Sequence, residues 1–252
     1  MRFVKQLIYG VFYLAIFGGL GFGLYKLNLF AAPTCMDGRL NQQEEEVDCG
    51  GPNCQSCELA HLQPISASVQ YFSIANNTNA ILIFSNPNLN YGATFSYTAD
   101  FYDVNRQKLY SMTKESYIYS AEAQRVIVEP NLPFNSGAIF GAPEVTLSNI
   151  SWKAKGEFQS PVIQLRQLST TVSGSVATVS GLVANRESSS VAEVAVGVML
   201  AKKSDKSPVG SSKTILQALR PFEERAFKVL IPLTATLKIA DIDTQIFTAA
   251  KR

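Results

Sequence analysis

The chain has 252 residues, a hydrophobic content of 46% and a net charge of only +2. A chain of this length holds one large domain or two small ones. Its 22 basic residues are nearly balanced by 20 acidic ones, which argues against the strongly basic surface of a nucleic-acid-binding protein. We therefore expect no nucleic-acid partner.

The first predicted element is an uncharged run over residues 6–25, "QLIYGVFYLAIFGGLGFGLY". A helix of this length rises ~30 Å at about 1.5 Å per residue, which matches the hydrocarbon core of a bilayer. Arg2 and Lys5 precede the run, and this positive charge predicts a cytoplasmic N-terminus. We expect residues 1–30 to be a single-pass anchor in the cell membrane, followed by extracytoplasmic domains.

A cleaved signal peptide is the alternative interpretation of this run. The run is longer than a typical signal core, Lys26 interrupts the approach to a cleavage site, and "LFA" before Ala32 matches such a site poorly. We therefore expect an uncleaved anchor. Within it, Gly19 and Gly23 form a G-x-x-x-G pattern that would let two helices approach as a homodimer. The competing interpretation is that glycine is simply common in membrane helices.

The next predicted element, residues 31–60, contains every cysteine of the chain. These are Cys35, Cys49, Cys54 and Cys57. An exported segment is in an oxidising compartment, where paired cysteines form disulfides. Four cysteines allow three pairings, and the sequence does not choose among them. The segment has almost no large apolar residues, so we expect two disulfides to replace a hydrophobic core.

Metal or redox chemistry is the alternative use of these cysteines. Zinc favours two close pairs, but only Cys54 and Cys57 form C-x-x-C, while Cys35 and Cys49 are 14 positions apart. A thioredoxin-like site needs a helix after C-x-x-C to lower the thiol pKa. Here "CQSC" ends a loop that contains glycine and proline, which disfavours redox catalysis.

Calcium is the alternative that the acidic residues of this loop favour. Oxygen ligands are spaced through it at Asp37, Asn41, Glu44 and Asp48. Calcium takes about 6–8 oxygen ligands, and the spacing does not match an EF-hand. The competing interpretation is a solvated, metal-free turn tied by disulfides. The expected cofactor is therefore none, with calcium as the alternative.

The loop reads "C-x-D-G-x-x-N-Q-x-E-x-x-x-D-C-G-G-P" and resembles a cysteine-rich motif of many bacterial surface proteins. The apolar anchor followed by "PTC-x-D" is similar to uncharacterised single-pass envelope proteins of candidate-phylum bacteria. The resemblance covers roughly the first 57 residues and departs at Gln43, where glycine is usual, and at the extra Asn53. It implies an exported, anchored location and no known activity.

From residue 67 onward, apolar and polar residues alternate with period two, as in "FSYTADF" and "VTLSNISWK". This alternation, with turn signals between the runs, predicts an antiparallel β-sandwich of roughly seven strands. The run "ILIFSNP" is a candidate edge strand, because Pro87 is best tolerated at an edge or a strand end. An edge strand could pair with a strand of a partner protein.

The pattern recurs after about 100 residues, which predicts two tandem domains over residues 61–155 and 156–252. The equivalent positions are Arg125 and Arg225, Pro130 and Pro232, and Asn86 and Asn185. The predicted fold class is thus mainly β: an N-terminal transmembrane helix, a small disulfide-rich segment and two tandem antiparallel Ig-like β-sandwiches.

The segment "ADFYDVNRQKLY" and its surroundings resemble the small Ig-like β-sandwich group that includes FxLYD and related late-embryogenesis-type domains. The resemblance covers residues 67–250 loosely, and the second copy lacks the aromatic residue and the YD pair. It implies an extracytoplasmic module for protein contact or spacing, without a catalytic apparatus.

Catalytic constellations are not apparent in the sequence. His61, the one histidine, lies in a linker, so no Ser-His-Asp or Cys-His arrangement is expected in the sandwiches. The pair Glu223 and Glu224 is expected in a turn, and Asp241 and Asp243 on the polar face of one strand, all solvated.

The expected function is therefore a non-enzymatic, membrane-anchored extracytoplasmic protein. It would serve as a structural spacer or bind another envelope protein. The first alternative is a calcium-dependent adhesion or sensor component that uses the acidic loop. The second is an enzyme or assembly accessory whose active groups come from a partner.

Overall fold

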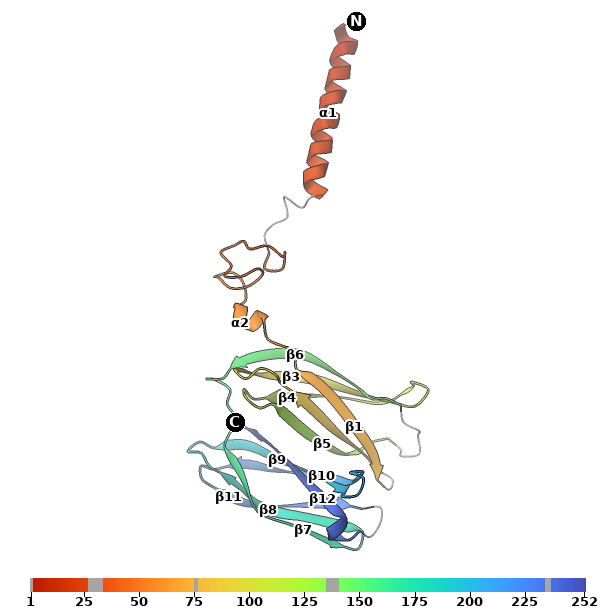
Figure 1. Cartoon of the computed structure of the whole chain (residues 1–252), viewed down its shortest axis with the longest axis vertical. Coiled ribbons are helices and arrows are strands. Elements are labelled where there is room, and N and C mark those ends of the chain that lie inside the picture. The colour runs from red at the N-terminus through yellow and green to blue at the C-terminus, as the bar shows by residue number, and fades with distance from the viewer. Residues whose placement is uncertain (1, 27–33, 75–76, 135–140, 234–236) are drawn as a thin grey trace. The chain divides into compact units, whose positions relative to one another are not determined.

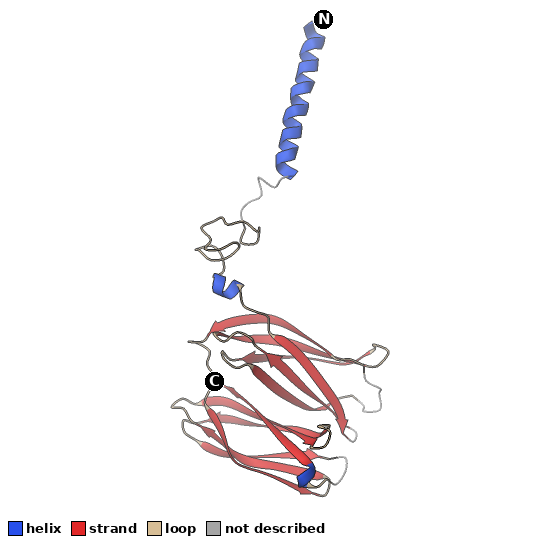
Figure 2. Ribbon diagram, viewed as in Figure 1, coloured by secondary structure: helices blue, strands red, loops and turns tan. Residues whose placement is uncertain are grey.

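The computed structural model describes residues 2–26, 34–74, 77–134, 141–233 and 237–252. The chain forms two compact units, Met1–Leu62 and Gln63–Arg252. The first unit holds the described α-helices, and the second is built of strands (Figures 1 and 2). The expected end of the anchor at residue 30 and the cleavage motif before Ala32 lie outside the described residues.

Helix α1, Arg2–Lys26, contains the whole predicted apolar run. An 18-residue window of it has a mean hydropathy of 1.9, and none of its residues is buried within the unit. A helix that is apolar on all sides needs an apolar surrounding, and its length and composition suit a membrane span. Gly19 and Gly23 lie one turn apart on this helix, and the homodimer stays a prediction.

The cysteine segment is held by two disulfides, Cys35–Cys54 and Cys49–Cys57. The structure thereby selects one of the three pairings that the sequence leaves open. Regular structure is limited here to one bridge, Glu46 with Cys49, and the short helix α2, Cys57–Ala60. Only Cys49 and Gly50 are buried among the described residues of this segment, which confirms that cross-links replace a core.

Twelve described strands form four antiparallel sheets of three strands each in the second unit. The sheets of the first half have the orders β1-β2-β5 and β4-β3-β6, and those of the second half β11-β8-β7 and β10-β9-β12. The strands of the first half are β1 Ser66–Ile74, β2 Asn77–Ser85, β3 Tyr91–Tyr102, β4 Lys108–Ile118, β5 Gln124–Leu132 and β6 Glu144–Ala154. Those of the second half are β7 Ile163–Ser173, β8 Val176–Asn185, β9 Val191–Lys202, β10 Pro208–Leu219, β11 Glu224–Pro232 and β12 Ile242–Lys251, preceded by the 3-10 turn η1 Ile239–Asp241.

The two halves have the same strand order, with β7 to β12 in the places of β1 to β6. Each half has six described strands, close to the roughly seven expected. The linker between the two halves adds no strand in the described residues, and its backbone bonds to loops. Lys155 N–H donates to Asn90 C=O at 2.8 Å, and Ser120 N–H donates to Phe158 C=O at 3.4 Å.

Each half encloses its own hydrophobic core, and the predicted period-two alternation supplies it. In β3 the alternate residues Phe95, Tyr97 and Phe101 are buried, with Phe84 of β2 packed 5.1 Å from the Phe95 ring. The second core is rich in valine, and β9 contributes Val194, Val196, Val198 and Leu200. The predicted mainly β fold, with sheets that pair as two sandwiches, is confirmed.

The assignment of "ILIFSNP" as an edge strand is wrong, because β2 is the central strand of its sheet. Ile81, Leu82 and Phe84 of this strand are all buried. A continuous apolar run is typical of a strand that is covered on both faces, and that signal outweighs the proline. Pro87 follows the end of the strand and does not interrupt the ladder.

Two buried asparagines have the same role in the two halves. The Asn86 amide donates to Tyr91 C=O at 2.8 Å, and its Oδ1 accepts from Asn88 N–H at 3.0 Å. The Asn185 amide donates to Ser189 C=O at 2.8 Å, and its Oδ1 accepts from Glu187 N–H at 3.1 Å. Each side chain closes the loop between the second and third strands of its half, as expected for equivalent positions.

Replacing Asn185 with Ala should lower the free energy of unfolding by about 3 kcal/mol, because buried backbone groups lose their partners. Denaturant titration of the full-length protein in detergent, followed by circular dichroism, measures the change. Asn105→Ala is the matched control, since Asn105 is exposed and only its backbone N–H bonds to Asp103. Equal stability of the two variants would contradict this role.

Candidate functional site at the junction of the two sandwiches

The structure brings the four predicted calcium ligands together in one hydrogen-bond network, in which the three carboxylates accept from the loop itself and Asn41 donates. Asp48 Oδ1 accepts N–H bonds from Asp37 at 2.9 Å and Gly38 at 2.8 Å. Glu44 Oε2 accepts from the N–H groups of Asn41 at 3.1 Å and Asp48 at 3.3 Å. The carboxylates thus satisfy backbone donors that this coreless loop leaves without sheet partners.

Asp37 and Asn41 lie at the centre of this network. The Asn41 amide donates to Asp37 Oδ2 at 2.9 Å, and this bond lowers the pKa of Asp37 below its usual value. Asn41 Oδ1 is buried and has no hydrogen-bond partner among the described residues. Gln43, which stands where the motif that the loop resembles has glycine, adopts a positive φ of 65°, a conformation that costs a residue with a side chain more than it costs glycine.

All four cysteines are in disulfides, so none of them offers the thiolate that a zinc site or a redox-active cysteine needs. Glu44 Oε1 lies 3.4 Å from the Cys54 sulfur, but that sulfur carries no thiolate. His61 is exposed, and its Nε2 lies 3.5 Å from Glu46 Oε2. A pair this exposed contributes little to stability.

The carboxylate pairs of the second half are engaged in ion pairs. Glu223 Oε1 lies 2.6 Å from Arg225 Nη2, while Glu224 faces Arg166 and Arg186. The prediction that Asp241 and Asp243 share one strand face is wrong. Asp241 ends the turn η1, because the chain bends before β12 begins.

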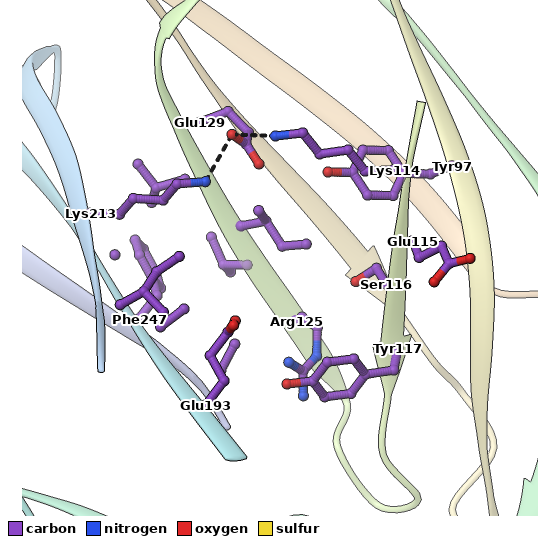
Figure 3. Close-up of a pocket in the computed structure, with 17 residues that line it drawn as sticks. Tyr97, Lys114, Glu115, Ser116, Tyr117, Arg125, Glu129, Glu193, Lys213 and Phe247 are labelled. Carbon is purple, nitrogen blue, oxygen red and sulfur yellow. Dashed lines mark hydrogen bonds and ion pairs between the residues drawn. The ribbon is translucent and has the colours of Figure 1, made fainter. Parts of the chain in front are cut away.

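A cavity of about 170 Å³ lies where the two sandwiches meet within the second unit (Figure 3). Edge strand β5 lies against β9, β10 and β12 there. One close contact joins Gly197 of β9, which is buried, and Val128 of β5, which is 2% exposed. A Cβ atom built on Gly197 would lie 2.8 Å from Val128 Cγ2, so the missing side chain is what permits this contact.

Glu129 of β5 joins the two halves electrostatically. Its Oε2 lies 2.9 Å from the Nζ of Lys114 in its own half and 2.9 Å from the Nζ of Lys213 in the other half (Figure 3). The Glu129 side chain is only 9% exposed, so its charge needs these partners. Glu129 lies four positions after Arg125. The equivalent residue of the second half, four positions after Arg225, is the buried apolar Val229, so this charge is present in the first half and absent at the matching position of the second.

Arg125 occupies the other end of the cavity, where it packs on Tyr117 (Figure 3). Its guanidinium carbon is 3.9 Å from the centre of the Tyr117 ring, and its Nη2 donates to Glu122 Oε2 at 2.7 Å. Arg125 is 3% exposed, yet its Nε has no partner among the described residues. By contrast, the equivalent Arg225 donates to Glu223 and to two backbone carbonyls.

Two tyrosines complete the junction. Burial raises the pKa of Tyr117 to about 12, so its hydroxyl is protonated at neutral pH. The Tyr119 hydroxyl donates to Ala250 C=O of β12 at 3.1 Å, which adds a second polar link between the halves.

Sequence reasoning missed this junction, although the run "RVIVE" contains a signal for it. Alternate residues of a strand lie on the same face, and Arg125 and Glu129 are therefore on the same face as Ile127. Because Ile127 packs against the first core, both charges are at inward positions. Charges at inward positions of a strand indicate partners in another element. Which element supplies them depends on tertiary contacts.

No protein-family model and no curated protein matches this chain. Among solved structures, the crystal structure of red sea bream transglutaminase is similar, with 10% sequence identity and a TM-score of 0.25. The match covers 76% of this chain and 31% of that one, so the chain spans about a third of the enzyme's length. A likeness of this degree carries no argument about activity. The fold, the two disulfides and the apolar helix fit the class of secreted or membrane β-proteins.

Gly197→Val should lower the free energy of unfolding by about 2 kcal/mol, because the new side chain overlaps Val128. It should also make the linker between the sandwiches more sensitive to protease. Denaturant titration and limited proteolysis of the full-length protein measure these effects. Gly156→Ala is the control, since a Cβ there meets nothing within 4 Å. A variant at Gly197 that behaves like this control would show that the close contact does not hold the halves together.

Proposed function

We propose that this chain is a non-enzymatic, single-pass membrane protein whose extracytoplasmic part is a structural spacer or a protein-binding module. The observation that carries the proposal is the junction of the two sandwiches within one compact unit. Glu129 with Lys213, Val128 with Gly197, and Tyr119 with Ala250 join the halves at separate points. A module fixed in this way holds a distance or presents a surface, which is what a spacer needs.

The proposed location follows from the order of the chain. An apolar helix precedes two disulfides, and disulfides persist in oxidising compartments. Arg2 and Lys5 favour a cytoplasmic N-terminus, which would place the cysteine segment and both sandwiches outside. We further propose that the sandwiches are Ig-like tandem copies, supported by their matched strand order and matched asparagines.

The proposal of a non-enzymatic role is supported by how the polar groups are used. The carboxylates Glu129, Glu223 and Glu224 each face lysine or arginine side chains. The one histidine, His61, lies in the first unit and on its surface. Histidine is the side chain that most often acts as a general base, and the second unit contains none.

The orientation predicts that a C-terminal tag on the full-length protein is digested by protease added to intact bacterial spheroplasts. A cytosolic marker protein must stay intact in the same sample. The matched variant lacks residues 2–26 and should leave the membrane fraction, because nothing else in the described chain is long and apolar enough to span a bilayer. Digestion of the tag only after lysis would refute the proposed topology.

Calcium binding by the acidic loop is the second candidate function, and the buried, unpartnered Asn41 Oδ1 favours it. This oxygen and the carboxylates of Asp37 and Glu44 are hard ligands of the kind calcium takes. A calcium-dependent adhesion or sensor role would follow if binding ordered the loop further.

Calorimetric titration of the full-length, oxidised protein with calcium should then give heat that Asn41→Ala and Asp37→Asn remove. Glu58→Gln is the control, because Glu58 is exposed and lies outside the acidic loop. Absence of heat at millimolar calcium would eliminate this function and leave the disulfide-tied, metal-free turn.

A further inference from the structure

Arg125 and its counterpart Arg225 in the second half use their guanidinium groups differently. Arg225 donates from Nε to Glu223 Oε1 at 2.9 Å and from Nη1 to Gln217 C=O at 2.6 Å. Arg125 donates from Nη2 to Glu122 Oε2 at 2.7 Å, and its Nε has no partner among the described residues. The arginine at the junction is therefore the one whose Nε donor is left without an acceptor.

This donor is buried at the junction cavity. Arg125 is 3% exposed and lines the cavity of about 170 Å³, with its guanidinium packed on the Tyr117 ring (Figure 3). A buried N–H without an acceptor is unfavourable, because it has lost its hydrogen bond to water. The Arg125 Nε therefore favours a cavity occupant that carries an acceptor atom.

Much of the remaining cavity wall is apolar, and both sandwiches contribute to it. The apolar lining includes Ile127 and Val128 of β5, Ala195 of β9, Ile215 of β10 and Phe247 of β12. An apolar cavity of about 150 Å³ is large enough to hold benzene. The junction cavity therefore suits an apolar body of roughly that size.

The charges near Arg125 favour a neutral acceptor over a carboxylate. Arg125 is already paired with Glu122, and Glu193 of β9 lines the same cavity. The Glu193 carboxylate accepts from the Gln217 amide at 3.0 Å and carries its own negative charge. A ligand carboxylate would add a further negative charge beside these two glutamates, whereas a carbonyl oxygen accepts the Nε hydrogen bond without one.

We propose that the junction cavity binds a small neutral carbonyl compound whose apolar body is about the size of a benzene ring. The carbonyl oxygen accepts from Arg125 Nε, and the apolar body packs between Val128 of the first half and Phe247 of the second. Because both halves form the wall, the bound molecule stabilises their docked arrangement. The inference goes beyond the proposed spacer role, since it makes the alignment of the two sandwiches respond to a ligand.

NMR titration of the full-length protein with three probes tests the proposal. Acetophenone carries the carbonyl, α-methylstyrene has the same shape with CH₂ in place of the oxygen, and benzoate carries a negative charge. Acetophenone should bind with a dissociation constant of roughly 1 mM or tighter, and benzoate should bind more weakly. Absence of acetophenone binding would mean that the cavity holds only water, and tighter binding of benzoate would overturn the neutral class of ligand.

Arg125→Met removes the donor and tests its contact with the carbonyl. The quantity to measure is the affinity for acetophenone relative to that for α-methylstyrene, because a general effect on the cavity changes both affinities. This ratio should fall about tenfold or more, the equivalent of one hydrogen bond from a charged donor. Arg225→Met makes the same change outside the cavity and should leave the ratio unchanged. An unchanged ratio in Arg125→Met would refute the role of Nε.

Ala195→Leu keeps the proposal falsifiable if Arg125→Met fails to fold. The larger side chain fills the cavity from β9 without changing a charge, so acetophenone binding should be lost. Ala226→Leu is the matched control, since Ala226 is exposed on β11 and lies outside the cavity. Acetophenone binding by Ala195→Leu at the parent affinity would place the probe elsewhere and overturn the inference.

These titrations are independent of the membrane topology, because they use purified protein. Failure of the spheroplast experiment with intact acetophenone binding would refute only the proposed location. The reverse result would refute only the ligand site at the junction.

Discussion

The second unit depends on one buried carboxylate that two lysines share. Glu129 occupies an inward position of an edge strand, and Lys114 and Lys213 approach the same oxygen from different sandwiches. A charge at such a position is unfavourable unless it is paired; Lys114 supplies one partner within the first sandwich, and Lys213 supplies the second only where the two sandwiches meet. Such an ion pair adds little to how tightly the two sandwiches associate and more to how they are aligned, because a misaligned arrangement would leave Glu129 without its second partner.

Apolar packing also holds the two sandwiches together at the junction. Gly197 lets the backbone of β9 approach Val128, while its neighbours on the opposite face of the strand fill the second core. Small residues on an outer sheet face therefore indicate a covered face and not a solvated one. The same junction leaves a cavity of about 170 Å³ beside the contact, because two twisted sheets that touch at few points do not fill the space around them.

The cysteine segment solves a different problem, which is to order a chain that has no core. Two disulfides reduce the freedom of the unfolded segment, and carboxylates of Asp48 and Glu44 take over the role of sheet partners for backbone N–H groups. The acidic residues therefore have a structural use even without a metal ion. Asn41 Oδ1 is the one buried oxygen of this loop that such a use leaves unexplained.

Elements with local signals can be predicted from the sequence. Uniform apolarity predicts α1, alternation predicts the buried faces of β3 and β9, and equivalent asparagines predict matched loops. Tertiary structure alone decided the disulfide pairing, the central place of β2 and the partners of Arg125 and Glu129. Those features join residues far apart in the chain, and neither period nor composition records which distant strand a side chain will face. Each sandwich can therefore be predicted from its own sequence, but the cavity between them cannot, because residues of both halves line it.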